Sequence, residues 1–132
     1  MGVLSVLLAA GAGFALGAVW YMVLANPWMQ SAGIKTGADG KPENGQDPRI
    51  FAATFVLQLI VAGMMRHIFT MAGIDTLGAG LLAGAGIGLC FITPWIGINN
   101  LYVGRPLRLT AIDGGYATLA CAAMGLVLSL FG

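Results

Sequence analysis

The chain has 132 residues, of which 58% are hydrophobic and 8% are charged, and its formal net charge is +1. Ordinary soluble domains carry about 25% charged residues, so this composition, with a mean hydropathy of +0.88, excludes a soluble globular protein. It predicts a membrane protein.

Long intervals without charge indicate where the helices lie. A spanning helix needs about 20 mainly apolar residues, and its backbone groups must be hydrogen-bonded within the helix. The sequence therefore predicts an all-α membrane protein with four transmembrane helices, at residues 3–25, 50–72, 77–101 and 107–131. These helices use nearly the whole chain, so we expect a single domain over 1–132, a compact and glycine-rich four-helix bundle.

The first expected helix contains the stretch MGVLSVLLAAGAGFALGAVW, which has no basic leader. We therefore interpret it as a permanent helix and not as a cleaved secretory signal. Gly13 and Gly17 are four residues apart and share one face, where small side chains let helix backbones approach closely. Trp20 and Tyr21 follow near the end of this helix.

The connection after the first helix is polar over residues 35–49 and rich in glycine and proline, which indicates an irregular loop. The first and third connections carry five of the six basic residues, and Arg66 alone lies near the middle turn. The positive-inside rule then places both connections, including loop 26–49, in the cytoplasm. Both termini would lie outside the cell inner (cytoplasmic) membrane.

Small residues recur every fourth position in the last two expected helices. They are Gly80, Gly84 and Gly88 in the third helix, and Ala117, Cys121 and Gly125 in the fourth. This spacing predicts close packing, with the third helix at the centre of the bundle. The small faces can hold one chain together, or join it to a second copy or to a larger membrane protein. Thr93-Pro94 predicts a kink, because proline removes one backbone hydrogen bond.

Polar side chains gather around the third connection and the end of the first helix. This predicted polar cluster at the cytoplasmic end consists of Trp20, Tyr21, Asn99, Asn100, Arg105, Arg108, Asp113 and Tyr116. Asp113 lies about 9 Å along the fourth helix, below the membrane interface. An aspartate there costs about 2.5–3.5 kcal/mol and needs a partner. The candidates are Arg105, the amides of Asn99 and Asn100, and the Tyr21 hydroxyl.

Three interpretations of this cluster are open. Asp113 can be a structural lock that ties the fourth helix to its neighbours, with Arg105 and Arg108 as interfacial anchors. The two arginines beside a helix N-terminus can instead bind the phosphate of an anionic lipid or an acidic partner segment. In the third interpretation Asp113 carries a proton or cation through a pore.

Two segments resemble a known family. FALGAVWYMVLANPWMQSAGI at 14–34 and NNLYVGRPLRLTAIDGGYATLACAAMGLVL at 99–128 are similar to the bacterial membrane family catalogued as domain of unknown function 1761. The positions that match are Gly17, Trp20, Tyr21, Trp28, Met29, Asn99 or Asn100, Arg105, Pro106, Asp113 and Tyr116. The resemblance implies the four-helix layout and assigns no activity.

The residue types give little support to catalysis. There is one histidine, with no Ser-His-acid set and no carboxylate pair, so we predict no enzyme, no cofactor and no metal site. A basic aromatic surface for nucleic acid is also missing. Two classes remain: an accessory or scaffold subunit, and a small transporter or channel that builds its pathway as an oligomer. Thr54, Gln58 and Thr93 look too scattered for a polar stripe, which favours the first class.

Overall fold

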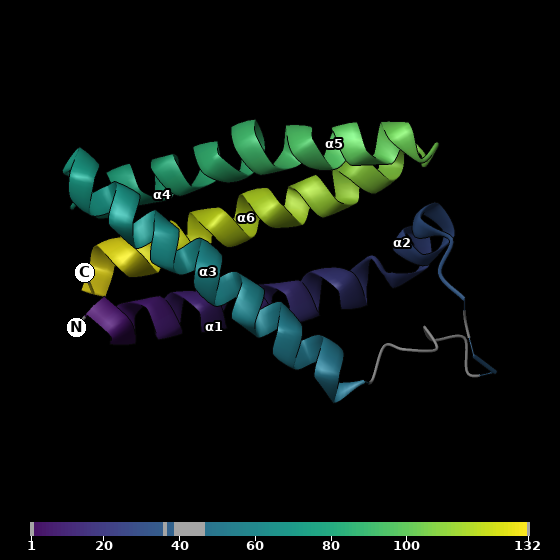
Figure 1. The fold of residues 1–132 in the computed structure, drawn as a ribbon, viewed down its shortest axis with the longest axis horizontal. Helices are drawn as coiled ribbons and strands as arrows, with labels where there is room; N and C mark the ends of the chain where they lie inside the picture. The colour runs from purple at the N-terminus through teal and green to yellow at the C-terminus, as the bar shows by residue number, and fades with distance from the viewer. Residues whose placement is uncertain (1, 36, 39–46, 132) are drawn as a thin grey trace.

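The computed structural model describes residues 2–35, 37–38 and 47–131, and within them it contains helices and no strand. The elements are α1 (Gly2–Val23), α2 (Ala25–Ala32), α3 (Pro48–Ala72), α4 (Leu77–Ile87), the π-helical turn η1 (Gly88–Ile92), α5 (Thr93–Tyr102) and α6 (Leu107–Phe131). Four segments are long and apolar enough to cross a membrane, because α4, η1 and α5 form one continuous span (Figure 1). The all-α fold with four transmembrane helices is confirmed, and each span ends within two residues of its expected bounds.

The first connection contains a short helix, α2, that the sequence did not lead us to expect. Pro27 is the third residue of this helix, where its missing N–H costs no intrahelical hydrogen bond. Gly33 ends α2 with a φ of 68°, in the left-handed region that favours glycine. Residues 36 and 39–46 of the predicted polar loop lie outside the described residues.

α3 begins at a well-formed cap. The Asp47 carboxylate accepts the backbone N–H of Arg49 at 2.9 Å, and the Arg49 guanidinium lies 3.2 Å from the same side chain. Pro48 occupies the first helical position, where its fixed φ is already suited to a helix. The Arg49 side chain holds the pKa of Asp47 below its usual value, because the hydrogen bonds favour the charged carboxylate.

The central helix of the molecule is α6. It packs against α1 on one side and against the α4–η1–α5 span on the other, whereas α3 packs on α1 and makes only sparse contact with α6 (Figure 1). The prediction that the third span would be central is therefore wrong. In α6, Gly125 lies against α4 and Met124 lies against α1, so this helix has close neighbours on two sides.

Backbone-to-backbone contact joins α4 to α6. A Cβ atom on Gly84 would overlap the Cys121 carbonyl, and a Cβ atom on Gly80 would lie 2.6 Å from the Gly125 carbonyl. Gly88 would meet the backbone of Ala117 in the same way. In lipid, where helices gain nothing from leaving water, such close packing supplies much of the attraction between them. The glycine stripe of the third span is therefore used inside the chain.

The predicted kink at Thr93-Pro94 takes the form of the π-helical turn η1. The Thr93 N–H bonds to the Gly88 carbonyl five residues earlier, and the Thr93 hydroxyl donates to the same carbonyl at 2.7 Å. Pro94 has no N–H to continue the regular pattern, so the wider turn accommodates its ring. The Thr93 hydroxyl also lies 3.1 Å from the Gly114 carbonyl, which links this turn to α6.

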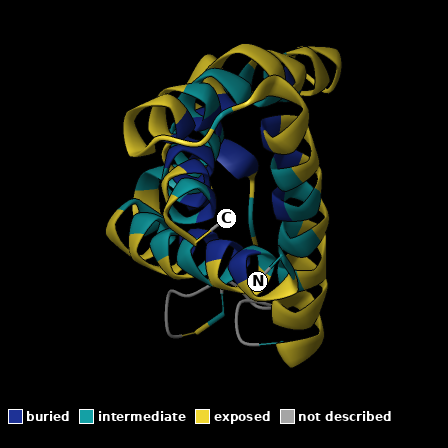
Figure 2. Ribbon diagram, turned by 90° about the vertical axis from the view of Figure 1, so that its left-hand side faces the viewer, coloured by how far each residue is buried: buried dark blue, intermediate teal, exposed yellow. Residues whose placement is uncertain are grey.

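The buried core is small and occupies the side of α1, α3 and α6 where these helices face one another (Figure 2). Its members are Ala9, Ala10, Ala62, Met65, Phe69, Cys121, Met124 and Leu128. The outward faces carry exposed leucine, isoleucine, valine and phenylalanine side chains (Figure 2). An apolar exterior of this kind fits a lipid environment, in which the backbone is satisfied within each helix.

Candidate functional site

The aspartate of the predicted cluster is paired with a tyrosine of the first helix. The Tyr21 hydroxyl donates to Asp113 Oδ1 at 2.6 Å, and it joins the end of α1 to the second turn of α6. Of the candidate partners, Tyr21 is the one that bonds to Asp113, and the described residues place no basic group in an ion pair with it. A short O–H···O⁻ bond is among the stronger hydrogen bonds that proteins form.

A second tyrosine continues the polar contacts toward the middle of the membrane. Tyr116 donates to the Gly13 carbonyl at 2.8 Å and accepts a hydrogen bond from the Gln58 side-chain amide. A Cβ atom on Gly17 would lie 2.7 Å from the Tyr116 hydroxyl, so this glycine makes room for the ring. Gln58 reaches Tyr116 because α3 crosses α1 beside this ring.

Contacts between aromatic rings connect the Tyr21–Asp113 pair to the Tyr116–Gln58 pair. The Tyr21 ring lies edge-on to Tyr116 and to Trp28, with a centroid distance of 5.4 Å in each pair. Trp20 Nε1 donates to the Ile112 carbonyl at 2.9 Å, which adds another bond between α1 and α6. Edge-to-face pairs contribute roughly 0.5–1.5 kcal/mol beyond their buried area. These contacts hold Tyr21 in position for Asp113.

We call Tyr21, Gln58, Asp113 and Tyr116 the polar network. At 1.5 Å per residue, Asp113 lies about 9 Å and Tyr116 about 14 Å from the start of α6. The hydrocarbon core is about 30 Å thick, so the network extends from near one membrane surface to the midplane. It draws on three of the four spans, α1, α3 and α6.

The other predicted cluster residues lie apart from this network. Arg108 donates from Nε to Ser31 Oγ at 2.7 Å, which fastens α2 to α6. Asn100 donates to Thr110 at 2.9 Å across the α5–α6 turn. Asn99 and Arg105 are exposed, and their side chains form no hydrogen bond within the described part of the chain. The structure thus divides the predicted cluster into a network within the membrane and a separate set of contacts at its surface.

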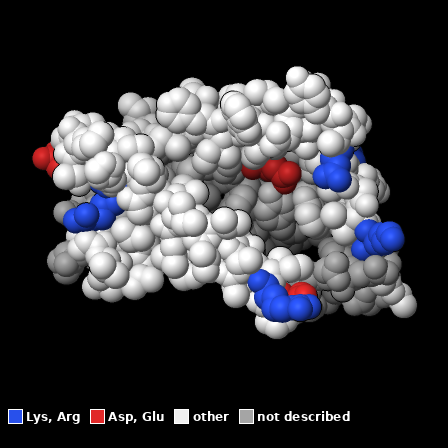
Figure 3. All heavy atoms as spheres, in the orientation of Figure 1, with Lys and Arg blue, Asp and Glu red and all other residues white. Residues whose placement is uncertain are grey.

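The polar network is incompletely satisfied. Asp113 is only partly buried, and Gln58 Oε1 is buried without a hydrogen-bond partner among the described residues. Figure 3 shows basic side chains toward the ends of the molecule and an acidic group lying in a hollow of this face, away from both ends. Asp113 is the one described carboxylate within a spanning helix. A charged group thus faces an open part of the membrane region.

Sequence reasoning missed three polar residues that the structure brings into the cluster. Gln58 joins through the crossing of α3 over α1, Ser31 through the unexpected α2, and Thr110 through the α5–α6 turn. The contacts of Gln58 and Ser31 join distant segments, for which the sequence carries no local signal, whereas Thr110 lies just across the adjacent turn from Asn100. Within the described residues no three His, Cys, Asp or Glu side chains are close enough to hold a metal ion.

Comparisons with known proteins place the chain in one family. The family described as protein of unknown function (DUF1761) matches residues 4–129, which is nearly the whole chain. No curated protein and no solved structure matches it. The family match agrees with the resemblance carried by the two ends of the sequence, and it covers all four spanning helices. This small four-helix membrane protein therefore belongs to the DUF1761 family.

Proposed function

We propose that this protein is a non-catalytic accessory or scaffold subunit, and that another membrane protein covers the hollow around Asp113. The supporting observation is a carboxylate that faces an open part of the membrane region with one described hydrogen bond, from Tyr21. A carboxylate offers about four acceptor positions, so three remain for a partner. The partner of this proposal is a transmembrane helix that carries a hydrogen-bond donor or a cation.

Energies support this assignment. An aspartate within a spanning helix costs about 2.5–3.5 kcal/mol on insertion scales. One hydrogen bond to a charged group returns about 1.5–3 kcal/mol, so the Tyr21 bond offsets much of the cost and leaves little margin. A donor from a second protein could supply more at the Asp113 carboxylate, which is only partly buried.

The glycine stripe of the third span is already covered within the chain, which leaves the face around Asp113 for a partner. Gly80, Gly84 and Gly88 are occupied by α6 of the same chain, so the third span has no need of a partner along that stripe. A partner is then best placed where α3 and α6 make sparse contact and Asp113 is only partly buried. The same face serves a larger partner or, if it closes on itself, a homo-oligomer.

The test is gentle extraction of the tagged protein from its own membranes, followed by native mass spectrometry. We expect a stoichiometric complex with the unmodified protein and at least about tenfold less of it with Asp113→Asn, as loss of a charge-assisted bond implies. Asp75→Asn, which changes an exposed aspartate outside the spans, is the matched control. Equal recovery of the complex from both variants would mean that Asp113 only ties α6 to its neighbours within the chain and does not bind a partner.

A second candidate is a small transporter or channel that forms its pathway as an oligomer. The observation that favours it is a pair of hydrogen bonds, Tyr21 to Asp113 and Gln58 to Tyr116, that lie next to each other through a ring contact and extend toward the membrane midplane. If this function is correct, the extracted protein is a homo-oligomer without other subunits. Purified oligomer in vesicles would then conduct protons or cations, and Asp113→Asn would abolish that flux while the helical fold is retained.

We also propose that the protein lies in the cytoplasmic membrane with both termini outside. The support is the uneven distribution of basic residues, with five on the first and third connections and one near the middle turn. In this orientation Arg105, whose side chain forms no described hydrogen bond, is available to an anionic lipid, whereas Arg108 is partly engaged by α2. Reversing the charge of both arginines should then release bound anionic lipid.

A further inference from the structure

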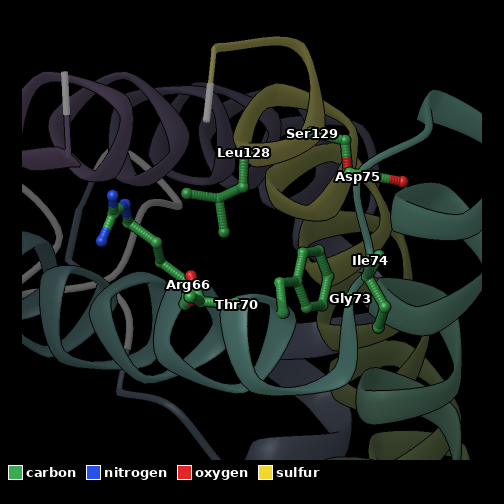
Figure 4. Close-up of a pocket in the computed structure, with 8 residues that line it drawn as sticks. Arg66, Thr70, Gly73, Ile74, Asp75, Leu128 and Ser129 are labelled. Carbon is green, nitrogen blue, oxygen red and sulfur yellow. The ribbon is translucent and has the colours of Figure 1, made fainter.

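The two ends of the molecule are built differently. At the end where the termini meet, a cavity of about 300 Å³ lies beside the last turns of α3 and α6 (Figure 4). Its polar side chains pack against separate helices, because Arg66 lies against Gly2 of α1 and Ser129 against Gly80 of α4. The opposite end carries α2, an eight-residue helix in sparse contact with α6 and α1 (Figure 1). An element with so few contacts can move while the four spans stay in place.

A single residue separates α2 from the first span. Leu24 lies between α1 and α2 with a φ of −103° and a ψ of 22°, outside the range of an α-helix. Pro27 explains the position of this break, because a proline ring crowds the carbonyl four residues earlier, here that of Val23. The Leu24 N–H still donates to the Trp20 carbonyl, and the Trp28 N–H to the Leu24 carbonyl. The break is therefore a hinge between two intact helices.

One side chain of α6 holds α2 in place. Arg108 donates from Nε to Ser31 Oγ at 2.7 Å. Its Nη2 lies 3.3 Å from the Pro27 carbonyl oxygen and 3.4 Å from Gln30 Oε1. Within the described part of the chain, no other side-chain hydrogen bond joins α2 to a span. Arg108 is an exposed residue, so water can replace these bonds, and the closed position of α2 depends on a small difference in free energy.

The position of α2 is linked to the polar network. Trp28 of α2 lies edge-on to the Tyr21 ring at a centroid distance of 5.4 Å, and the Tyr21 hydroxyl donates to Asp113. Arg108, which binds α2, precedes Asp113 by five residues and is about 7.5 Å nearer the start of α6. The α2 helix thus lies between the Tyr21–Asp113 pair and the membrane surface at this end. Its displacement would take Trp28 away from Tyr21 and admit water to the pair.

We propose that α2 is a lid that turns about Leu24, is held closed by Arg108, and controls access to Asp113 from this end of the molecule. Lids come from the weakly held parts of a fold, because they must open at low cost. The proposal adds regulation to the Asp113 site and rests on the proposed function for its purpose. The position of the lid, however, is a property of the chain alone and can be measured without a partner.

Thiol labelling measures how often the lid opens. In a chain with Cys90→Ala and Cys121→Ala, Asp113→Cys supplies the thiol, and a water-soluble maleimide is added to the protein in lipid nanodiscs. Arg108→Ala should raise the labelling rate at least about tenfold, as loss of a charged hydrogen bond implies. Arg105→Ala is the matched control, because it removes the same charge from an exposed side chain without a described hydrogen bond, and should leave the rate unchanged. Equal rates in the two variants would overturn the proposal.

Hydrogen exchange tests the lid in the chain that keeps Asp113. Exchange of the amides at 28–33 should become about tenfold faster with Arg108→Ala and about threefold faster with Ser31→Ala, while exchange in α6 stays the same. Arg105→Ala should change neither segment. Faster exchange throughout α6, or unchanged exchange at 28–33, would overturn the lid. Neither experiment includes a partner, so such a failure is distinct from failure of the native mass spectrometry test of Asp113.

Discussion

At the scale of single residues, Asp113 shows how a charged group is held within a spanning helix. Its described partner is a hydroxyl, from Tyr21 at 2.6 Å, and no described basic side chain pairs with it. Tyr21 is in turn held between Trp28 and Tyr116 by edge-on ring contacts. The position of the donor is thus determined by packing, which lowers the entropy lost when the hydrogen bond forms.

Removing the Tyr21 hydroxyl should destabilise the protein. We expect Tyr21→Phe to lower the free energy of unfolding by about 1.5–3 kcal/mol, the range for hydrogen bonds to charged groups. Tyr102→Phe is the control, because Tyr102 is 88% exposed and should change stability little. Titration of the folded protein with a denaturing detergent would measure both. Equal stabilities of the two variants would show that the Asp113 bond contributes nothing net.

Asp47 provides a pH-dependent prediction at the start of α3. Arg49 lowers the pKa of Asp47 in the folded state, so the capping interaction contributes stability above the unfolded pKa and is lost as pH falls through the folded pKa. Amide exchange in the first turn of α3, corrected for its intrinsic pH dependence, should therefore accelerate below about pH 4. Asp47→Asn keeps an acceptor but has no charge to lose, so its exchange should lack this acceleration. The same acceleration in the variant would contradict the assignment.

At the scale of helices, the pair formed by α4 and α6 depends on the absence of side chains. Gly80, Gly84 and Gly88 face the α6 backbone so closely that a Cβ atom would overlap it at each position. Gly78 and Gly86 on the same helix have open space around them. The glycines of α4 and η1 therefore divide into those that contact α6 and those that do not.

This difference gives a matched pair of substitutions in one helix. Gly84→Ala should lower the free energy of unfolding by about 1–3 kcal/mol, because the added methyl group forces the Cys121 backbone away. Gly86→Ala meets no atom within 4 Å, and should leave stability unchanged or raise it by up to about 1 kcal/mol. Detergent unfolding curves of the two variants test this directly. A Gly84→Ala protein as stable as Gly86→Ala would refute backbone contact between α4 and α6.

At the scale of the whole molecule, the four spans form an open arrangement. α3 lies on α1, α1 on α6 and α6 on the α4–η1–α5 span, while α3 meets α6 only sparsely (Figure 1). A closed bundle would bury Asp113 from every side, but here it is only partly buried, and an acidic group lies in a hollow of the surface (Figure 3). The open face is the basis of both proposed functions, because it offers a surface to a partner or a second copy.

The orientation proposed for this molecule can be tested by labelling. With both termini outside, Asp75→Cys should react with a membrane-impermeant maleimide on intact cells, and Lys35→Cys should react only after the cells are opened. The native thiols of Cys90 and Cys121 lie within spanning segments and serve as an internal background. The opposite pattern would reverse the orientation and place the turn between α3 and α4 on the cytoplasmic side.

The sequence by itself determined the number, the approximate bounds and the membrane location of the spanning helices. Runs of apolar residues must become helices in lipid, where unpaired backbone groups are too costly, so this result needs no knowledge of tertiary contacts. The same runs also contain the small-residue spacing of α4 and α6, and proline at position 94 marked the site of the π-helical turn. These signals are local in the chain.

Only the tertiary structure decided which helix is central and which polar groups meet. The sequence indicated the third span as the centre because its glycines are regular, but α6 takes that place because it packs against both α1 and the α4–η1–α5 span. Gln58 joins Tyr116, and Arg66 meets Gly2, through the crossing of α3 over α1. Helix order and crossing depend on shape complementarity between distant faces, and an apolar sequence carries little information about such pairing.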